Sequence, residues 1–239
     1  MTVPGRGGSQ PIPRPDAWKP GGLPTWHGLT ASDLLDTATA FERIATYHPS
    51  ELVRGPAVDR PASPGRRSAV LVALFPGEAG LTTLLTKRAA HLRKHAGEIS
   101  FPGGAVDDTD ESLWHTATRE AHEEIALPPA SVERLGLLDR FVTGASYSMV
   151  QPIVGRLDGR PDVVASPDEV AAVIETPLSE LVESGVYRQE VWPFGGAEYA
   201  MHFFDLVGET VWGATALMLD NLLNVIAGAE PKTQSRPLS

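Results

Sequence analysis

Residues 119–124, with the sequence REAHEE, have the spacing that most clearly indicates chemistry. On a helix, Glu120, Glu123 and Glu124 stand at positions i, i+3 and i+4, so their carboxylates share one face. Glu123 and Glu124 also fall near the negative end of the helix dipole, where an acid costs about 0.3–1 kcal/mol. A divalent cation would offset this repulsion, and clustered oxygen ligands suit Mg²⁺ or Mn²⁺. The segment therefore predicts a metal site, with a solvated charged face as the alternative.

Two segments upstream of this helix could bind an anionic ligand. Gly103 and Gly104, within FPGGAVDD, allow the backbone to approach a ligand closely or to adopt positive φ. The preceding segment, KRAAHLRKHAGE, supplies four cations, namely Lys87, Arg88, Arg93 and Lys94. In a chain with a formal net charge of −10, a basic segment before a glycine turn and an acidic helix indicates a phosphate-binding site beside a metal.

The hydrophobic pattern around these segments predicts strands alternating irregularly with long helices. Strands are expected at 68–75, 81–88, 137–144, 149–157, 170–178, 186–192 and 197–206. Helices are expected at 32–47, with Ser32 as the N-cap, at 111–125 and at 214–226. This arrangement predicts an α/β (α+β) sandwich with a mixed central sheet.

The length of 239 residues suits one sizeable domain with extensions. Residues 1–66 are predicted to be an N-terminal extension, made of a Pro/Gly-rich mobile or draped arm up to residue 24, one helix and a linker. Residues 67–228 are predicted to form the main domain, and residues 229–239 a disordered tail.

The composition excludes several classes of protein. The chain has no cysteine, so it can form neither disulfides nor thiolate metal sites. The net charge argues against general nucleic-acid binding, which needs a basic surface. The apolar runs are too short to span a membrane, and the N-terminus lacks the apolar core of a signal peptide. A cytoplasmic protein that binds neither nucleic acid nor membrane is therefore expected.

Residues 104–127 resemble the Nudix box, whose pattern is G-x5-E-x7-R-E-U-x-E-E-x-G-U with U an aliphatic residue. Counting back eight residues from Arg119 reaches Glu111, as the pattern requires, and the three glutamates of REAHEE occupy its other acidic positions. The chain departs from the pattern in two places. Gly104 precedes Glu111 by seven residues rather than six, and Ala121 and Ala126 replace the first U and the glycine.

The adjoining segment, residues 84–104, is similar to the signature of the coenzyme A pyrophosphatase branch of the Nudix hydrolases. That signature reads L-L-T-x-R-[SA]-x3-R-x3-G-x3-F-P-G-G. Every fixed position is met, by Leu84, Leu85, Thr86, Arg88, Ala89, Arg93, Gly97, Phe101, Pro102, Gly103 and Gly104.

The two resemblances imply a Nudix-type α/β/α sandwich that hydrolyses the pyrophosphate bond of coenzyme A or its derivatives. The expected products are 4′-phosphopantetheine and adenosine 3′,5′-bisphosphate, and a homodimer is a further implication. Alternatives are a Nudix hydrolase of ADP-ribose, NADH or a nucleoside triphosphate, and a non-catalytic binding module of the same fold.

The resemblance also implies roles for individual residues. Mg²⁺ or Mn²⁺ would be held by Glu120, Glu123 and Glu124, which Arg119 would orient through an ion pair, with Glu111 as its expected partner. The general base is left open between Glu120 and Glu169. Substrate contacts are expected from Arg88, Arg93, Gly103 and Gly104.

Overall fold

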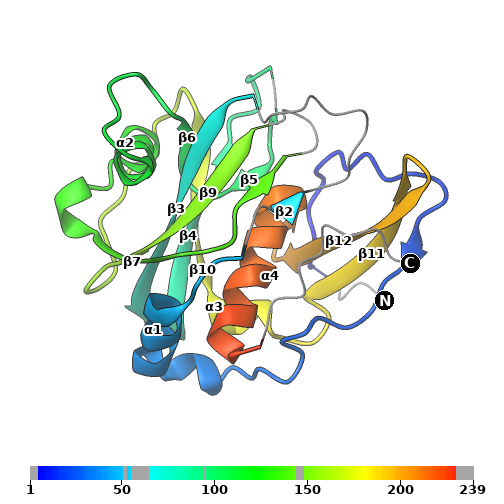
Figure 1. Cartoon of the computed structure of the whole chain (residues 1–239). Helices are drawn as coiled ribbons and strands as arrows, with labels where there is room; N and C mark the ends of the chain where they lie inside the picture. The colour runs from blue at the N-terminus through cyan, green and yellow to red at the C-terminus, as the bar shows by residue number, and fades with distance from the viewer. Residues whose placement is uncertain (1–4, 51–52, 55–64, 94, 144–147, 230–239) are drawn as a thin grey trace.

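A mixed sheet of nine strands carries the site in the computed structural model, which describes residues 5–50, 53–54, 65–93, 95–143 and 148–229 (Figure 1). Six strands follow one another across the sheet: β10 (Val170–Pro177), β4 (Gly80–Arg88), β3 (Arg67–Gly77), β9 (Met149–Arg156), β8 (Phe141–Val142) and β2 (Val53–Arg54). Three more pair with β4, β3 and β9 respectively: β5 (Ile99–Ser100), β6 (Gly103–Ala105) and β7 (Glu133–Leu137). The β3–β9 and β2–β8 pairs are parallel and the others antiparallel, which confirms the predicted mixed sheet.

Strand β3 is apolar along most of its length because both faces of the sheet are covered. Side chains alternate between the faces of a strand, so Leu71 and Phe75 pack in one core cluster whereas Val72 and Leu74 pack in the other. A near-continuous apolar run of this kind is typical of a strand buried on both sides.

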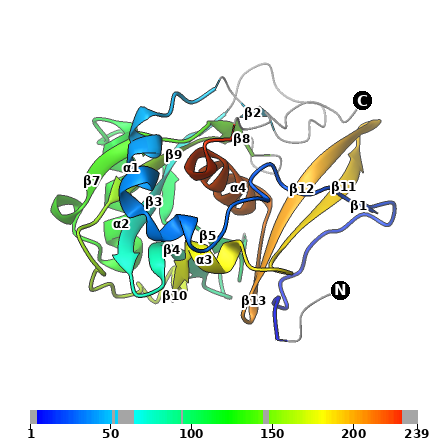
Figure 2. The same ribbon diagram turned by 90° about the horizontal axis from the view of Figure 1, so that it is seen from below.

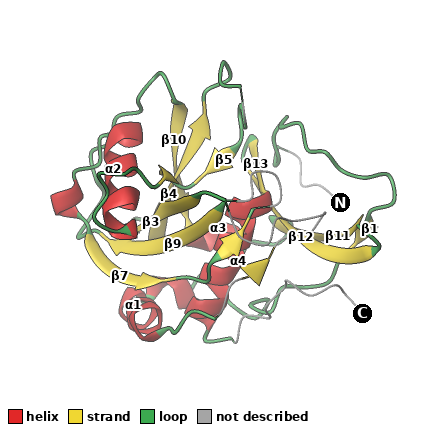
Figure 3. Cartoon of the chain, turned by 45° about the horizontal axis from the view of Figure 1, so that its top comes forward, coloured by secondary structure: helices red, strands yellow, loops and turns green. Residues whose placement is uncertain are grey.

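Helices cover the two faces of the sheet unequally. Helix α2 (Leu113–Ile125) lies alone on one face, and α1 (Thr37–Thr46) and α4 (Gly213–Ala227) lie on the other (Figure 3). A short helix, α3 (Leu178–Leu181), follows β10, and two 3₁₀ turns occur at Asp33–Leu35 and Pro129–Ser131. The predicted helices therefore form, and the α/β/α arrangement is confirmed.

A second, four-stranded sheet packs on the far side of α4. Its order is β1 (Lys19–Pro20), β11 (Tyr187–Phe194), β12 (Ala197–Leu206) and β13 (Glu209–Trp212), and all its pairs are antiparallel. Helix α4 is buried on nearly every side between the two sheets, as expected for a helix that is apolar all round.

The described part of the predicted N-terminal arm is draped along the second sheet. Strand β1 pairs with β11, and Figure 2 shows the blue chain beside that strand. Arg6 lies 2.8 Å from Glu180, and Arg14 lies 2.5 Å from Glu190, whose side chain is almost fully buried. The arm is thus held by backbone hydrogen bonds and by ion pairs.

Two boundaries differ from the prediction for local reasons. Helix α1 begins at Thr37 rather than after Ser32, because the Asp36 carboxylate accepts a hydrogen bond from the Thr39 backbone N–H and caps the helix there. Of the strand predicted at 137–144, only β8 at Phe141–Val142 forms as a separate strand, and Leu137 is the last residue of the earlier strand β7. Both strands pair with β9. The predicted linker at 55–64 and residues 230–239 of the tail lie outside the described residues.

None of the helices in the described part of the chain is both long enough and apolar enough to cross a membrane.

Candidate active site

Helix α2 presents the acidic residues because its opposite face is anchored to the sheet. Ala117, Ala121 and Ile125 are fully buried against β3. Glu120 and Glu124 directly precede Ala121 and Ile125, so they stand about 100° around the helix from that buried face. The helix begins at Leu113, where the Ser112 hydroxyl accepts a hydrogen bond from the His115 backbone N–H at 3.1 Å.

Glu124 is the most deeply buried acid of the helix, with 3% of its surface exposed. Its carboxylate accepts a hydrogen bond from the Gly103 backbone N–H at 3.2 Å and lies 3.9 Å from the Arg88 guanidinium. Burial raises the pKa of Glu124 to about 7, and repulsion from Glu120 and Glu169 adds to this effect. The Gly103 N–H and the Arg88 guanidinium therefore stabilise the charged carboxylate by less than the loss of water destabilises it.

Glu120 lies one turn earlier, against the glycine strand β6. Burial raises the pKa of its carboxyl, although Arg119 lies 3.1 Å away and favours the charged form. A Cβ on Gly104 would stand 2.5 Å from this carboxylate, and a Cβ on Gly103, whose φ is +154°, would stand 2.4 Å from the Ala69 carbonyl oxygen. Gly104 therefore lets β6 lie close to Glu120 on α2, and Gly103 lets β6 lie close to β3.

Arg119 is held by Asp110 and not by the predicted Glu111. Its Nε and Nη2 each donate to the Asp110 carboxylate at 2.9 Å, and the Thr116 hydroxyl donates to the same carboxylate at 2.9 Å. This bidentate pair holds the pKa of Asp110 well below its usual value and raises that of Arg119. The side chain of Asp110 is wholly inaccessible, whereas Glu111 is exposed.

Glu123 does not converge with the other two glutamates. Its side chain is 58% exposed and forms an ion pair with Arg119 at 3.1 Å, and it is absent from the cavity lining. In the described part of the chain, no group of three or more histidine, aspartate or glutamate side chains is arranged so as to hold a metal ion. The predicted cluster of three carboxylates is therefore not preformed.

Glu169 joins the site from the segment before β10. Its backbone carbonyl accepts a hydrogen bond from the Ala89 N–H at 2.8 Å, which ties it to the end of β4 beside Arg88. A residue 45 positions beyond Glu124 in the sequence thus reaches the same cavity.

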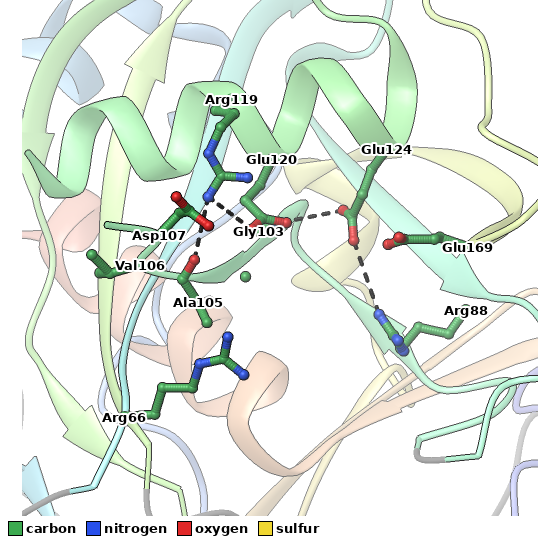
Figure 4. A pocket seen from close by; sticks show the side chains of 11 residues that line it. Arg66, Arg88, Gly103, Ala105, Val106, Asp107, Arg119, Glu120, Glu124 and Glu169 are labelled. Carbon is green, nitrogen blue, oxygen red and sulfur yellow. Dashed lines mark hydrogen bonds and ion pairs between the residues drawn. The ribbon is translucent and has the colours of Figure 1, made fainter. Parts of the chain in front are cut away.

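These side chains surround a cavity of about 300 Å³ (Figure 4). It is lined by Arg66, Arg88, Gly103, Gly104, Ala105, Val106, Asp107, Arg119, Glu120, Glu124 and Glu169. Seven of the nine predicted site residues are among them. The two that are not are Glu123 and Arg93, which is exposed on the loop between β4 and β5.

Comparison with known proteins identifies the family. A family model described as NUDIX domain matches residues 65–194. A relative from Cronobacter sakazakii, named "Uncharacterized Nudix hydrolase NudL", is 43% identical over 178 residues, which cover 70% of this chain and 86% of the relative. The chain belongs to the Nudix family.

One more relative and one solved structure are similar to this chain. A protein of the same name from Escherichia fergusonii is 40% identical over 174 residues, again covering 70% of this chain and 86% of the relative. A solved structure of a MutT/nudix family protein from Enterococcus faecalis covers 76% of this chain and 68% of its own, at 17% identity and a TM-score of 0.48.

The geometry explains how this chain accommodates its unusual Nudix box. The Nudix box places its first acid six residues after the glycine and eight residues before the arginine. Counting from Gly104 gives Asp110, whereas counting back from Arg119 gives Glu111. The structure pairs Arg119 with the acid counted from the glycine. The extra residue therefore lies between Asp110 and the start of the helix. Counting six residues from Gly104 would have identified Asp110 as the partner of Arg119 from the sequence alone.

The Nudix box also ends in an unusual way. Ala126, in place of the glycine, adopts the left-handed conformation with φ +54° and closes the helix through its backbone N–H, which donates to the His122 carbonyl at 2.9 Å. The helix therefore stops at Ala126, two residues before the proline pair Pro128 and Pro129. A non-glycine residue in this conformation is strained.

The oxygen donors facing the cavity suit a hard divalent cation. The buried Glu124 and the half-buried Glu120 face it with raised pKa values, and Glu169 lines it beside Glu124. A cation would relieve the cost of keeping these acids charged, and Mg²⁺ commonly completes its shell with water and substrate phosphate rather than with protein groups alone. The residues present therefore fit a divalent metal, which Glu120 and Glu124 would hold.

Proposed function

We propose that this Nudix protein hydrolyses the pyrophosphate bond of coenzyme A or its derivatives, giving 4′-phosphopantetheine and adenosine 3′,5′-bisphosphate. Family membership supports the coarser statement that it hydrolyses a nucleoside diphosphate derivative. The finer statement rests on one observation. Arg88, Gly103 and Gly104, all fixed positions of the coenzyme A signature, line the same cavity as the acids of the Nudix box.

Nudix enzymes generally use a divalent metal ion, and we propose that here it is Mg²⁺ or Mn²⁺. Glu120 and Glu124 would hold it, and Glu123 would become a further ligand after a change of side-chain rotamer. When bound, such an ion neutralises phosphoryl oxygens and acidifies a coordinated water.

The residues of the chain would perform the remaining tasks. Arg88, which enters the cavity with a buried Nε that has no hydrogen-bond partner among the described residues, would donate to oxygens of the pyrophosphate. Arg119, fixed by Asp110, would keep Glu120 oriented toward the cavity. The oxygen of water forms a bond to one phosphorus, and the bond from that phosphorus to the bridging oxygen breaks.

Glu169 is the residue we propose as general base, with Glu120 as the alternative. It lines the cavity beside Glu124 and Arg88, and a carboxylate in hydrogen-bond reach of the attacking water could take its proton. Arg93 lies outside the cavity, so it would contact a substrate phosphate only beyond the cavity's edge. The homodimer and the cytoplasmic location remain predictions.

A panel of substrates tests the proposal. Coenzyme A, dephospho-coenzyme A, ADP-ribose, NADH and nucleoside triphosphates would each be incubated with the protein and either Mg²⁺ or Mn²⁺, and the products identified by mass. The proposal predicts that coenzyme A yields 4′-phosphopantetheine and adenosine 3′,5′-bisphosphate at the highest kcat/KM. Faster cleavage of ADP-ribose or NADH would refute the substrate assignment, and no cleavage of any compound would favour a binding module.

A further inference from the structure

The three arginines that line the cavity differ in how they are engaged. Arg119 is shared among three carboxylates, those of Asp110, Glu120 and Glu123. Arg88 lies 3.9 Å from Glu124. Arg66 lines the same cavity and forms no ion pair with any residue in the described ranges.

The backbone of Arg66 is fixed, although its side chain is exposed. Its carbonyl oxygen accepts a hydrogen bond from the Met149 N–H at 2.8 Å, and the carbonyl of Arg67 accepts one from Val106 at 2.9 Å. These bonds hold the start of β3 between β9 and the segment after β6. Arg66 is therefore a cation on a rigid base at the cavity's edge, and a site on a rigid element can position a ligand accurately.

Arg66 lies apart from the carboxylates of α2. Figure 4 shows Glu120 and Glu124 entering from α2 on one side and Arg66 extending from the opposite side, beyond Ala105. A pyrophosphate bound to a cation on the acidic side would be contacted by Arg88. Arg66 could bind a further anionic group of the same substrate, because no carboxylate in the described residues forms an ion pair with this arginine.

We propose that Arg66 determines substrate specificity by binding the phosphate on the 3′ position of the substrate's adenosine. This inference rests on the proposed function, because it takes coenzyme A as the substrate. The planar guanidinium can donate two hydrogen bonds to one phosphate. Adenine pyrophosphates that lack a 3′-phosphate present nothing for this contact.

Steady-state kinetics of three variants test the role of Arg66. Arg66→Ala is expected to lower kcat/KM for coenzyme A by about 10-fold, a charge-assisted contact reduced by solvent screening, and to change kcat/KM for dephospho-coenzyme A by less than about 2-fold. Arg66→Lys should restore part of the loss, because it keeps the charge without the fork. Arg67→Ala is the matched control, since it removes the same charge from the neighbouring exposed residue, which does not line the cavity.

Equilibrium binding separates this inference from the proposed function. The wild-type protein should bind adenosine 3′,5′-bisphosphate more tightly than AMP, and Arg66→Ala should remove that difference while thermal unfolding shows an intact fold. If the protein does not cleave coenzyme A, the proposed function is wrong. The binding measurement still tests whether Arg66 binds the 3′-phosphate. Equal losses for coenzyme A and dephospho-coenzyme A, or the same losses in Arg67→Ala, would overturn the inference.

Discussion

Replacing Glu124 by glutamine should stabilise the metal-free protein at alkaline pH while disabling the enzyme. The pKa of Glu124 is raised from 4.5 to about 7 in the folded protein, mainly by burial. A raised carboxyl pKa means that folding favours the protonated form, so the cost of burying the charge is absent below pH ~4.5 and complete above pH ~7. At about 1.4 kcal/mol for each pKa unit, the full cost is roughly 3 kcal/mol.

The glutamine variant removes this charge with little change of shape. Its side-chain oxygen can still accept the hydrogen bond from the Gly103 N–H. In EDTA, the wild-type protein should therefore lose stability between pH 5 and pH 8, by up to about 3 kcal/mol relative to the variant. Urea unfolding at both pH values, followed by circular dichroism, measures the difference. With metal present, kcat of the variant should fall by about 100-fold or more.

Glu123→Gln is the control for this experiment. Its carboxylate belongs to the same helix but is 58% exposed, so its unfolding free energy should change by less than about 0.5 kcal/mol at either pH. Indistinguishable pH dependence in the wild-type protein and Glu124→Gln would refute the argument from burial. Near-normal turnover of Glu124→Gln at saturating Mg²⁺ would refute its role in binding the metal.

Three further predictions concern residues around the cavity. Asp110→Asn should lower the free energy of unfolding in urea by about 1–3 kcal/mol, because it weakens the charged pair with Arg119. Glu111→Gln should leave that free energy unchanged. A larger loss in Glu111→Gln than in Asp110→Asn would identify Glu111 as the partner of Arg119. Ala126→Gly should raise the unfolding free energy by up to about 1 kcal/mol, since glycine tolerates the left-handed conformation, and an unchanged or lower value would contradict the strain. Glu169→Gln should lower kcat by about 100-fold and alter the pH–rate profile, and a wild-type profile would transfer the role of base to Glu120.

Much of the fold could be predicted because local pattern and global structure agree. The apolar run of β3 and the alternation of buried and exposed positions on α2 are local signals, and both elements form within a few residues of the predicted bounds. Glu120, Glu124 and Arg88 were also predictable, since the motifs that contain them are short and continuous. The prediction was weaker where a capping side chain decides a boundary, as Asp36 does for α1.

The remaining features of the site depend on contacts that spacing alone does not determine. Helical geometry places Glu123 on the same face as Glu120, but its rotamer is set by the ion pair with Arg119. Arg119 in turn had two candidate partners one residue apart, and only the path of the loop selects Asp110. Arg66 lies 37 residues before Gly103 and belongs to no motif, so only the pairing of β3 with β6 brings it to the cavity.

Competition between substrates in one reaction tests the central claim most directly. Equal concentrations of coenzyme A, dephospho-coenzyme A, ADP-ribose and NADH would be mixed with the wild-type protein and Mg²⁺, and the depletion of each followed by mass spectrometry. Because the compounds compete for one site, their relative rates of loss give the ratios of kcat/KM without separate calibration. The account predicts that coenzyme A is consumed first and that adenosine 3′,5′-bisphosphate accumulates with it. Earlier consumption of ADP-ribose or NADH, with coenzyme A left intact, would contradict it.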